Sequence, residues 1–122
     1  MTTSAFTSID LIVPDVPAAA RMLIDGFGAT AVVEEPEFAE VDLGGLTVMF
    51  SRTAMVPVEP ARGVILHLEV EDPEQTAERA VAHGASVLNP LTSTDWGTRS
   101  VLVSGPADTV IDLFCSISGD AA

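Results

Sequence analysis

Few residues of this chain carry side chains that could do chemistry, and their types restrict which chemistry is open. The sequence contains two histidines, His67 and His83, one cysteine, Cys115, and no lysine. Two histidines exclude a three-histidine metal site and leave at most two choices for the histidine of a Ser-His or Cys-His catalytic pair. Schiff-base chemistry is excluded as well, because it needs a lysine amine.

His67 is the candidate general base of this sequence. A histidine in that role needs a partner carboxylate, and either Glu69 or Asp112 would serve. The other two reactive side chains have structural interpretations. His83 is expected at the end of a helix, where it favours the negative end of the helix dipole. Cys115 has no basic neighbour in the sequence and is interpreted as a structural thiol.

The charge balance restricts the partners of the chain. Eighteen acidic residues stand against five basic ones, all arginine, which gives a net charge of -13. This charge excludes nucleic-acid binding through a basic face and makes an anionic membrane surface a poor partner. Cationic or neutral partners remain, and Arg99 either pairs with a nearby acid or anchors an anionic group of a ligand. The acidic residues that could focus a negative potential on a cation are Asp10, Glu40, Glu69 and Asp112.

Length and composition predict one globular domain over residues 1–122. A hydrophobic fraction of 48% with 19% charged residues excludes a disordered chain. The N-terminal segment has neither the basic start nor the long apolar run of a secretory signal, and no stretch approaches the roughly twenty apolar residues of a membrane span. We therefore expect a cytoplasmic location.

The chain contains an internal repeat. Residues 8–28 and 65–84 each read as an alternating strand, an aspartate, an alanine-rich helix and a glycine. Asp72, followed by Pro73 and Gln75, is typical of a helix start. Further strands are predicted over residues 29–34, 38–43, 46–51, 85–88, 99–103 and 110–114. The sequence thus predicts two β-α-β-β-β modules, at about 6–51 and 64–117, joined by a linker at 52–63.

This order predicts an α+β fold in which two modules form a curved mixed sheet around a cleft. One helix covers only one face of a four-stranded sheet, so the helices take the convex face and the other face lines the cleft. Strand alternation then assigns a mixed set of side chains to the lining. These are Asp10, Ile12, Phe38, Glu40, Asp42, Thr47, Met49, Ser51, Ile65, His67, Glu69, Val110, Asp112 and Phe114.

The paired modules resemble a known superfamily. The second half, VILHLEVEDPEQTAERAVAHGASVLNPLTSTDWGTRSVLVSGPADTVIDLF, is similar in the order of its elements to the vicinal oxygen chelate superfamily, which contains glyoxalases, bleomycin-resistance proteins and dioxygenases. The resemblance covers nearly the whole chain. It implies a two-module fold, a small-molecule cleft and a homodimer, with modules side by side or exchanged between subunits.

The resemblance places the four metal-ligand positions of the superfamily at Ser8, Met49, Ile65 and Asp112. Asp112 is the one carboxylate among them, and Ile65 has no donor atom. A divalent ion held by one protein oxygen would remain mostly hydrated, so no cofactor is expected. The chain therefore resembles most the metal-free, bleomycin-resistance-like members.

A displaced metal site is the alternative. Asp10 and His67 lie two residues beyond the usual ligand positions, about 6 to 7 Å further along their strands. Together with Asp112 or Glu69 they would hold a divalent metal. The chain would then be a metal-dependent lyase, isomerase or ring-cleaving dioxygenase.

The metal-free members imply a different function, sequestration of a drug by aromatic stacking and acidic charge. Phe38 and Trp96 are the candidates for stacking, each worth about 1 to 3 kcal/mol with a planar ligand. We expect a metal-independent protein that binds a cationic or aromatic natural product, as in antibiotic resistance, although a member that binds nothing remains a third hypothesis. The expected ligand-binding residues are Asp10, Phe38, Met49, His67, Glu69, Trp96, Arg99 and Asp112.

Overall fold

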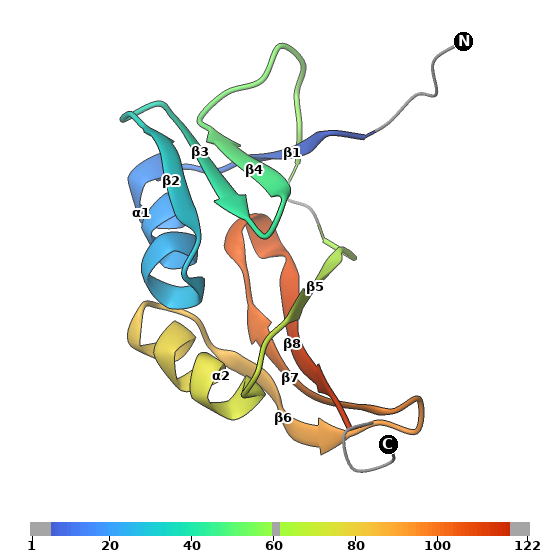
Figure 1. Ribbon diagram of the computed structural model, residues 1–122. Coiled ribbons are helices and arrows are strands. Elements are labelled where there is room, and N and C mark those ends of the chain that lie inside the picture. Colours follow the sequence, from blue (N-terminus) through green and yellow to red (C-terminus); the bar gives the residue numbers. More distant parts are fainter. Residues whose placement is uncertain (1–5, 60–61, 118–122) are drawn as a thin grey trace, which may run out of the picture.

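The computed structural model describes residues 6–59 and 62–117 and shows two halves of the same design (Figure 1). The first half contains β1 (Ser8–Ile12), α1 (Val16–Arg21), the π-helical turn η1 (Met22–Gly26), β2 (Thr30–Glu34), β3 (Phe38–Leu43) and β4 (Leu46–Ser51). The second contains β5 (Ile65–Glu69), α2 (Pro73–Ala82), β6 (Val87–Ser93), β7 (Thr98–Ser104), the 3-10 turn η2 (Pro106–Asp108) and β8 (Val110–Ser116). The predicted β-α-β-β-β order is confirmed in both halves.

Each half forms its own four-stranded mixed sheet. The strand orders are β1-β4-β3-β2 and β5-β8-β7-β6, so the two sheets have one topology. The first strand of each half runs parallel to the last, and the other neighbours are antiparallel. A parallel pair needs a long crossover, which the helix and the two intervening strands supply.

Both helices begin where the sequence predicts. The backbone N–H of Ala18 donates to Asp15, and the backbone N–H of Gln75 donates to Asp72, each over 3.1 Å. The two aspartates therefore satisfy backbone donors that a helix N-terminus leaves without partners. This repeated cap sets where each helix starts beside its sheet.

The helices cover one face of each sheet, here called the helix side, and leave the opposite face, here called the open face. Alternate strand residues, among them Val41, Phe50, Val103 and Leu113, are fully buried on the helix side. The buried hydrophobic residues of both halves form one cluster. Between the halves, Nε of Arg79 in α2 donates to the carbonyl oxygen of Asp25 in η1 over 2.8 Å.

The strand with the largest difference from prediction is β6. The sequence predicts it at 85–88, whereas the structure has it at Val87–Ser93, with two register shifts against β7. Pro90 lies inside this strand. Because β6 is the outermost strand of its sheet, the missing N–H of the proline costs no ladder bond.

Among the described residues, no helix has the length and hydrophobicity that a membrane span requires.

Candidate functional site

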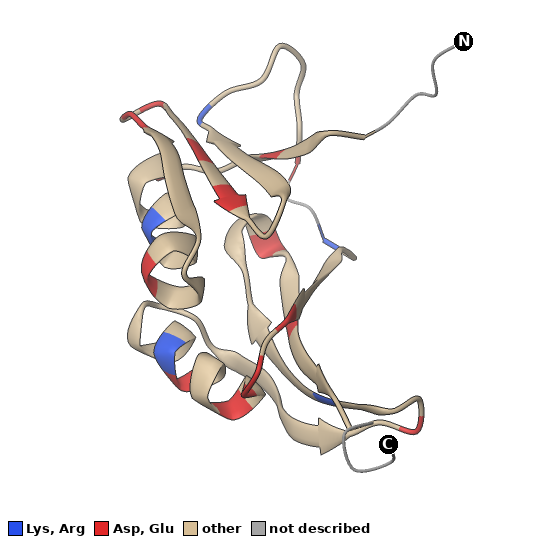
Figure 2. Cartoon of the chain, in the orientation of Figure 1, with Lys and Arg blue, Asp and Glu red and all other residues tan. Residues whose placement is uncertain are grey.

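The open face of the first sheet carries a row of three side chains that the strand register places next to each other. Met49 on β4 lies opposite Asp10 on β1 and opposite Glu40 on β3. Neighbouring strands are about 4.8 Å apart, so the thioether has a carboxylate on each side. Asp42 follows on β3, opposite Thr47. Acidic positions on β1 and β3 are red in Figure 2.

The carboxylate of Asp10 is held in place by a serine. The hydroxyl of Ser51 lies 3.0 and 3.2 Å from the two carboxylate oxygens of Asp10. Phe38 lies directly opposite Ser51 on β3. An aromatic ring, a thioether and an oriented carboxylate therefore share one face of the first sheet.

Among the residues that the structure describes, no arginine forms an ion pair with this row. In the described part of the chain, no ion pair involves Asp10, Glu40 or Asp42. Three arginines form ion pairs elsewhere: Arg21 with Asp25 and Glu34, Arg52 with Glu37, and Arg62 with Asp108. Arg79 donates to the carbonyl oxygen of Asp25, and Arg99 lies on the helix side, opposite Cys115. The carboxylates of the open face remain available to a cation.

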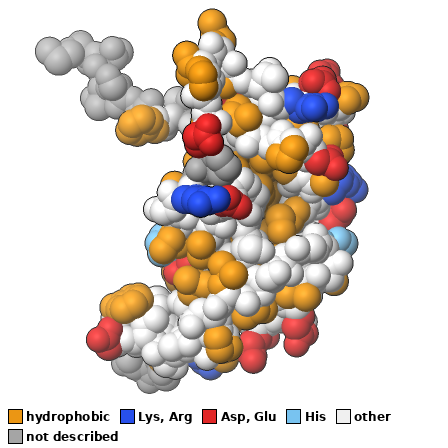
Figure 3. Space-filling model, turned by 180° about the vertical axis from the view of Figure 1, so that it is seen from behind, with side chains coloured by type: hydrophobic (Ala, Val, Ile, Leu, Met, Phe, Trp, Pro, Cys, Tyr) orange, Lys and Arg blue, Asp and Glu red, His pale blue; other side chains and the backbone are white. Residues whose placement is uncertain are grey.

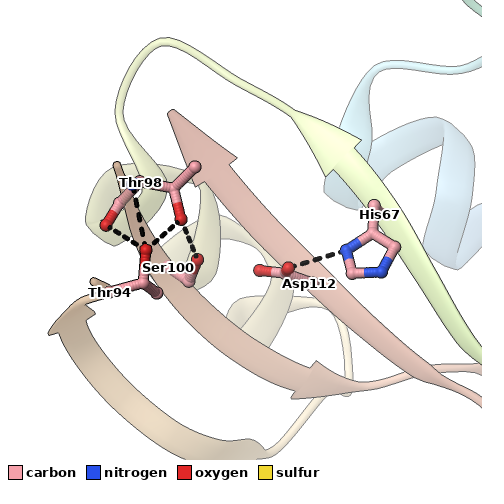
Figure 4. A network of polar contacts seen from close by, with 5 residues as sticks. All are labelled: His67, Thr94, Thr98, Ser100 and Asp112. Carbon is pink, nitrogen blue, oxygen red and sulfur yellow. Dashed lines mark hydrogen bonds and ion pairs between the residues drawn. The ribbon is translucent and has the colours of Figure 1, made fainter. Parts of the chain in front are cut away.

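The open face of the second sheet carries a histidine–aspartate pair. His67 on β5 lies opposite Asp112 on β8, and its Nδ1 is 2.7 Å from Oδ2 of the carboxylate (Figure 4). The side chain of His67 is 63% exposed and that of Asp112 only 15%. When the imidazole is neutral and Nδ1 donates, Nε2 presents its lone pair outward. The ring of Phe114 meets His67 edge-on, with centroids 6.4 Å apart.

The structure decides between the two partners that the sequence left open for His67. Asp112 holds the imidazole, whereas Glu69 lies at the end of β5, opposite Phe114. Oδ1 of Asp112 is buried and has no hydrogen-bond partner among the described residues. The carboxylate is thus committed to orienting the histidine.

A polar network on the same sheet was not foreseen from the sequence. The hydroxyl of Thr94 lies 2.8 Å from that of Thr98, which lies 3.4 Å from the hydroxyl of Ser100 (Figure 4). Ser100 is buried, although it faces the open side. Strand alternation predicts that Thr98 and Ser100 share a face. The hairpin between β6 and β7, which brings Thr94 to the same network, has no signal in the sequence.

The displaced metal site is not assembled in this structure. His67 and Asp112 meet, but Asp10 belongs to the other sheet and bonds to Ser51. Over residues 6–59 and 62–117, no three His, Cys, Asp or Glu side chains form a group suited to a metal ion.

The usual ligand positions of the superfamily do not fit a divalent metal either. The resemblance places these positions at Ser8, Met49, Ile65 and Asp112. Ile65 has no donor atom, and Asp112 already contacts His67. Hard divalent cations take several oxygen ligands, and catalytic zinc keeps three protein ligands. The donor set present here supplies neither.

Two expected ligand-binding residues are not brought to the open face. Trp96 lies in the turn between β6 and β7, with 77% of its surface exposed. Arg99 lies opposite Cys115 on β7. It is next to Ser100, which faces the open side, so strand alternation places Arg99 on the helix side. With Glu71 and Glu74 it lines a pocket of about 300 Å³. The remaining expected residues lie on the two open faces: Asp10, Phe38, Met49, His67, Glu69 and Asp112.

No curated protein sequence matches the chain significantly. A solved structure described as a "conserved domain protein" is 36% identical, with a TM-score of 0.77 over 93% of this chain and 99% of that one. A glyoxalase-related enzyme from Fulvimarina pelagi is 22% identical, with a TM-score of 0.79 over 93% of this chain and 89% of that chain.

A third similar structure is a glyoxalase/bleomycin resistance protein/dioxygenase family enzyme from Burkholderia phytofirmans PsJN. It is 16% identical, with a TM-score of 0.77 over 92% of this chain and 99% of that chain. The family profile of the Glyoxalase/Bleomycin resistance protein/Dioxygenase superfamily matches residues 5–113. With this match over most of its length and the paired modules of its fold, the chain belongs to the glyoxalase/bleomycin resistance protein/dioxygenase superfamily.

Proposed function

We propose that this chain binds a cationic small molecule with a planar or otherwise apolar part, without a metal ion. The observation that carries this proposal is the row in which Met49 lies between Asp10 and Glu40, with no arginine paired to either acid among residues 6–59 and 62–117. A thioether makes favourable contacts with aromatic rings, and the flanking carboxylates attract positive charge.

The geometry of the row suits a ligand larger than a simple ion. Asp10 and Glu40 are two strand spacings apart, which is roughly 10 Å between backbones. A flat ring resting on Met49 would have a carboxylate on each side and Phe38 at the next position. A cation about 4 Å from one of these carboxylates gains roughly 1 to 4 kcal/mol, depending on how much water remains between them.

Sequestration of a cationic natural product, in the manner of bleomycin resistance, is the use that we propose for such binding. The superfamily to which the chain belongs includes bleomycin resistance proteins by name. We also propose a cytoplasmic homodimer in which the open faces are covered by the partner or by exchanged modules. Sedimentation equilibrium at several concentrations tests the dimer, and a mass of one chain throughout would contradict it.

A second candidate function, proton transfer, is favoured by the pair His67 and Asp112. With Nδ1 held 2.7 Å from the carboxylate, Nε2 of the exposed imidazole is oriented to accept a proton from a bound ligand. Asp112 would act as a positioning residue, since its carboxylate contacts Nδ1 of the histidine. This candidate needs no metal ion.

Calorimetric titration tests the first proposal. The ligands are bleomycin, the cationic two-ring molecule 1-methylquinolinium and its neutral counterpart naphthalene. We expect 1-methylquinolinium to bind and EDTA to leave its affinity unchanged. Asp10→Asn or Glu40→Gln should weaken this binding at least tenfold, and more at low salt than at high salt. Glu78→Gln makes the same change of charge on the exposed side of α2 and is the matched control. It should change the affinity for 1-methylquinolinium little.

Three outcomes would contradict the proposal. The first is binding that EDTA abolishes and a divalent metal restores, which would indicate a metal-dependent site. The second is equal affinity of the wild-type protein and Asp10→Asn. The third is equal affinity for 1-methylquinolinium and naphthalene, which would remove the charge from recognition.

A further inference from the structure

A cavity of about 140 Å³ lies where the two modules meet, and most of its lining residues belong to the helix side of the sheets. Ten of its eleven lining residues are hydrophobic, and the other is His67. Leu11 and Val48 line it from the first sheet, and Leu66, Leu68 and Ile111 line it from the second. We call this space the junction cavity.

The walls of the junction cavity are fixed by the packing of each module. Leu11, Val48 and Ile111 are at most 5% exposed, and each belongs to the apolar face that its own sheet turns toward the helices. Leu23, in the turn η1 directly after α1, is 4% exposed and also lines the cavity. These side chains are held by their own module, so they cannot move into the gap between modules without leaving a gap elsewhere.

Two residues of the cavity lining are exposed, Leu46 and His67. Leu46, the first residue of β4, lines the cavity and is 46% exposed. Gly44 and Gly45, both at positive φ, form the turn immediately before it. From behind, hydrophobic side chains gather across the middle of the molecule, at the level where the two halves meet (Figure 3). A small molecule could therefore reach the cavity from solvent past Leu46.

Water is a poor occupant of this cavity. A buried water molecule makes two to four hydrogen bonds, and His67, the one lining residue with a polar side chain, already contacts Asp112 through Nδ1. A cavity of about 150 Å³ lined by leucine, isoleucine and phenylalanine stays dry and takes up benzene or xenon. The junction cavity has nearly this volume and a similarly apolar lining, although it opens to solvent.

We propose that the junction cavity is a second binding site, which takes an uncharged hydrocarbon ring of about the size of benzene. The site is independent of the carboxylates on the open face, because none of the carboxylates in the row beside Met49 lines it. Its ligand preference is opposite to that proposed for the open face, where a cation is favoured. A neutral ring binds by burying apolar surface, whereas a cation would lose its water without gaining a partner carboxylate.

Titration of the leucine-methyl-labelled protein with benzene, followed by NMR, tests this proposal. We expect saturable ring-current shifts for the methyl groups of Leu11, Leu23, Leu66 and Leu68, and a higher melting temperature with benzene present. Xenon should cause shifts at the same methyl groups. A wild-type protein without saturable shifts from either probe overturns the proposal, and this result needs no variant.

Matched variants locate the binding. Leu68→Phe adds volume to the cavity wall and should weaken benzene binding at least tenfold, whereas Leu68→Met conserves volume and should retain it. Leu102→Phe is the control, because Leu102 is half-buried on the open face of the same sheet. Asp10→Asn should leave benzene binding intact. Loss of benzene binding in Leu102→Phe or Asp10→Asn, or full binding in Leu68→Phe, would place the ring elsewhere and contradict the proposal.

Discussion

The imidazole of His67 and the carboxylate of Asp112 face each other across the parallel β5–β8 pair, with 2.7 Å between Nδ1 and Oδ2. The resemblance to the superfamily places Asp112 at a position where metal-using members carry a metal ligand. Here its Oδ2 accepts from a histidine. The same open-face location therefore serves to orient an imidazole.

This contact predicts the tautomer of His67. In the wild-type protein the neutral ring should carry its proton on Nδ1, because Oδ2 of Asp112 accepts there. In Asp112→Asn the two tautomers should mix. Imidazole nitrogen-15 spectra measure this, with His83 as an internal control whose signals should not change. Dominance of the Nε2–H tautomer in the wild-type protein would contradict the contact.

Phe38 and Trp96 should differ as ligand-binding residues. Phe38 lies on the open face, opposite Ser51, whereas Trp96 lies in the exposed β6–β7 turn. We expect Phe38→Ala to weaken 1-methylquinolinium binding by about 1 to 3 kcal/mol through loss of stacking. Trp96→Ala should leave the affinity unchanged in calorimetric titration. The reverse pattern would show that the turn, and not the first sheet, contacts the ligand.

The core residue Phe50 should contribute strongly to stability. Its side chain is fully buried on the helix side of β4. Phe50→Ala removes this buried surface and leaves a cavity, so the free energy of unfolding should fall by about 3 to 5 kcal/mol. Urea unfolding followed by circular dichroism measures the change. Leu46→Ala, at a half-exposed position on the same strand, should cost much less, and equal losses would contradict the packing described.

The helix cap at Asp72 should contribute about as much to the free energy of unfolding as helix caps in other proteins do. Asp72→Ala removes the acceptor of the Gln75 N–H and should lower the free energy of unfolding by about 1 kcal/mol. Asp72→Asn keeps an acceptor oxygen and should recover most of this loss. Asp95→Ala, in the exposed turn beside Trp96, is the control. No loss in Asp72→Ala would mean that the N-terminus of α2 is satisfied in another way.

Arg99 offers a test of which face of β7 meets the ligand. Its side chain lies on the helix side, opposite Cys115, and lines a pocket with Glu71 and Glu74. Arg99→Gln should therefore leave the affinity for 1-methylquinolinium unchanged in the same titration. A change of tenfold or more would indicate that the ligand occupies the helix side as well.

The local pattern of the sequence determined much of this structure. Strand alternation assigned Asp10, Glu40 and Met49 to one face, because successive side chains of a strand point to opposite sides. Asp72 predicted a helix start through its capping chemistry, which depends only on the next three residues. The repeat of both signals predicted two modules of one topology. These signals are local, so they could be read without knowledge of the fold.

Contacts between distant segments were decided by the tertiary structure. Alternation left both Glu69 and Asp112 as partners for His67, and the register of β5 against β8 selected Asp112. The edge position of β6 allowed it to run through Pro90, beyond the predicted strand. The junction cavity has no signal in the sequence, because its shape depends on how two separately packed modules meet. Register and packing join residues far apart in the chain, which local patterns do not record.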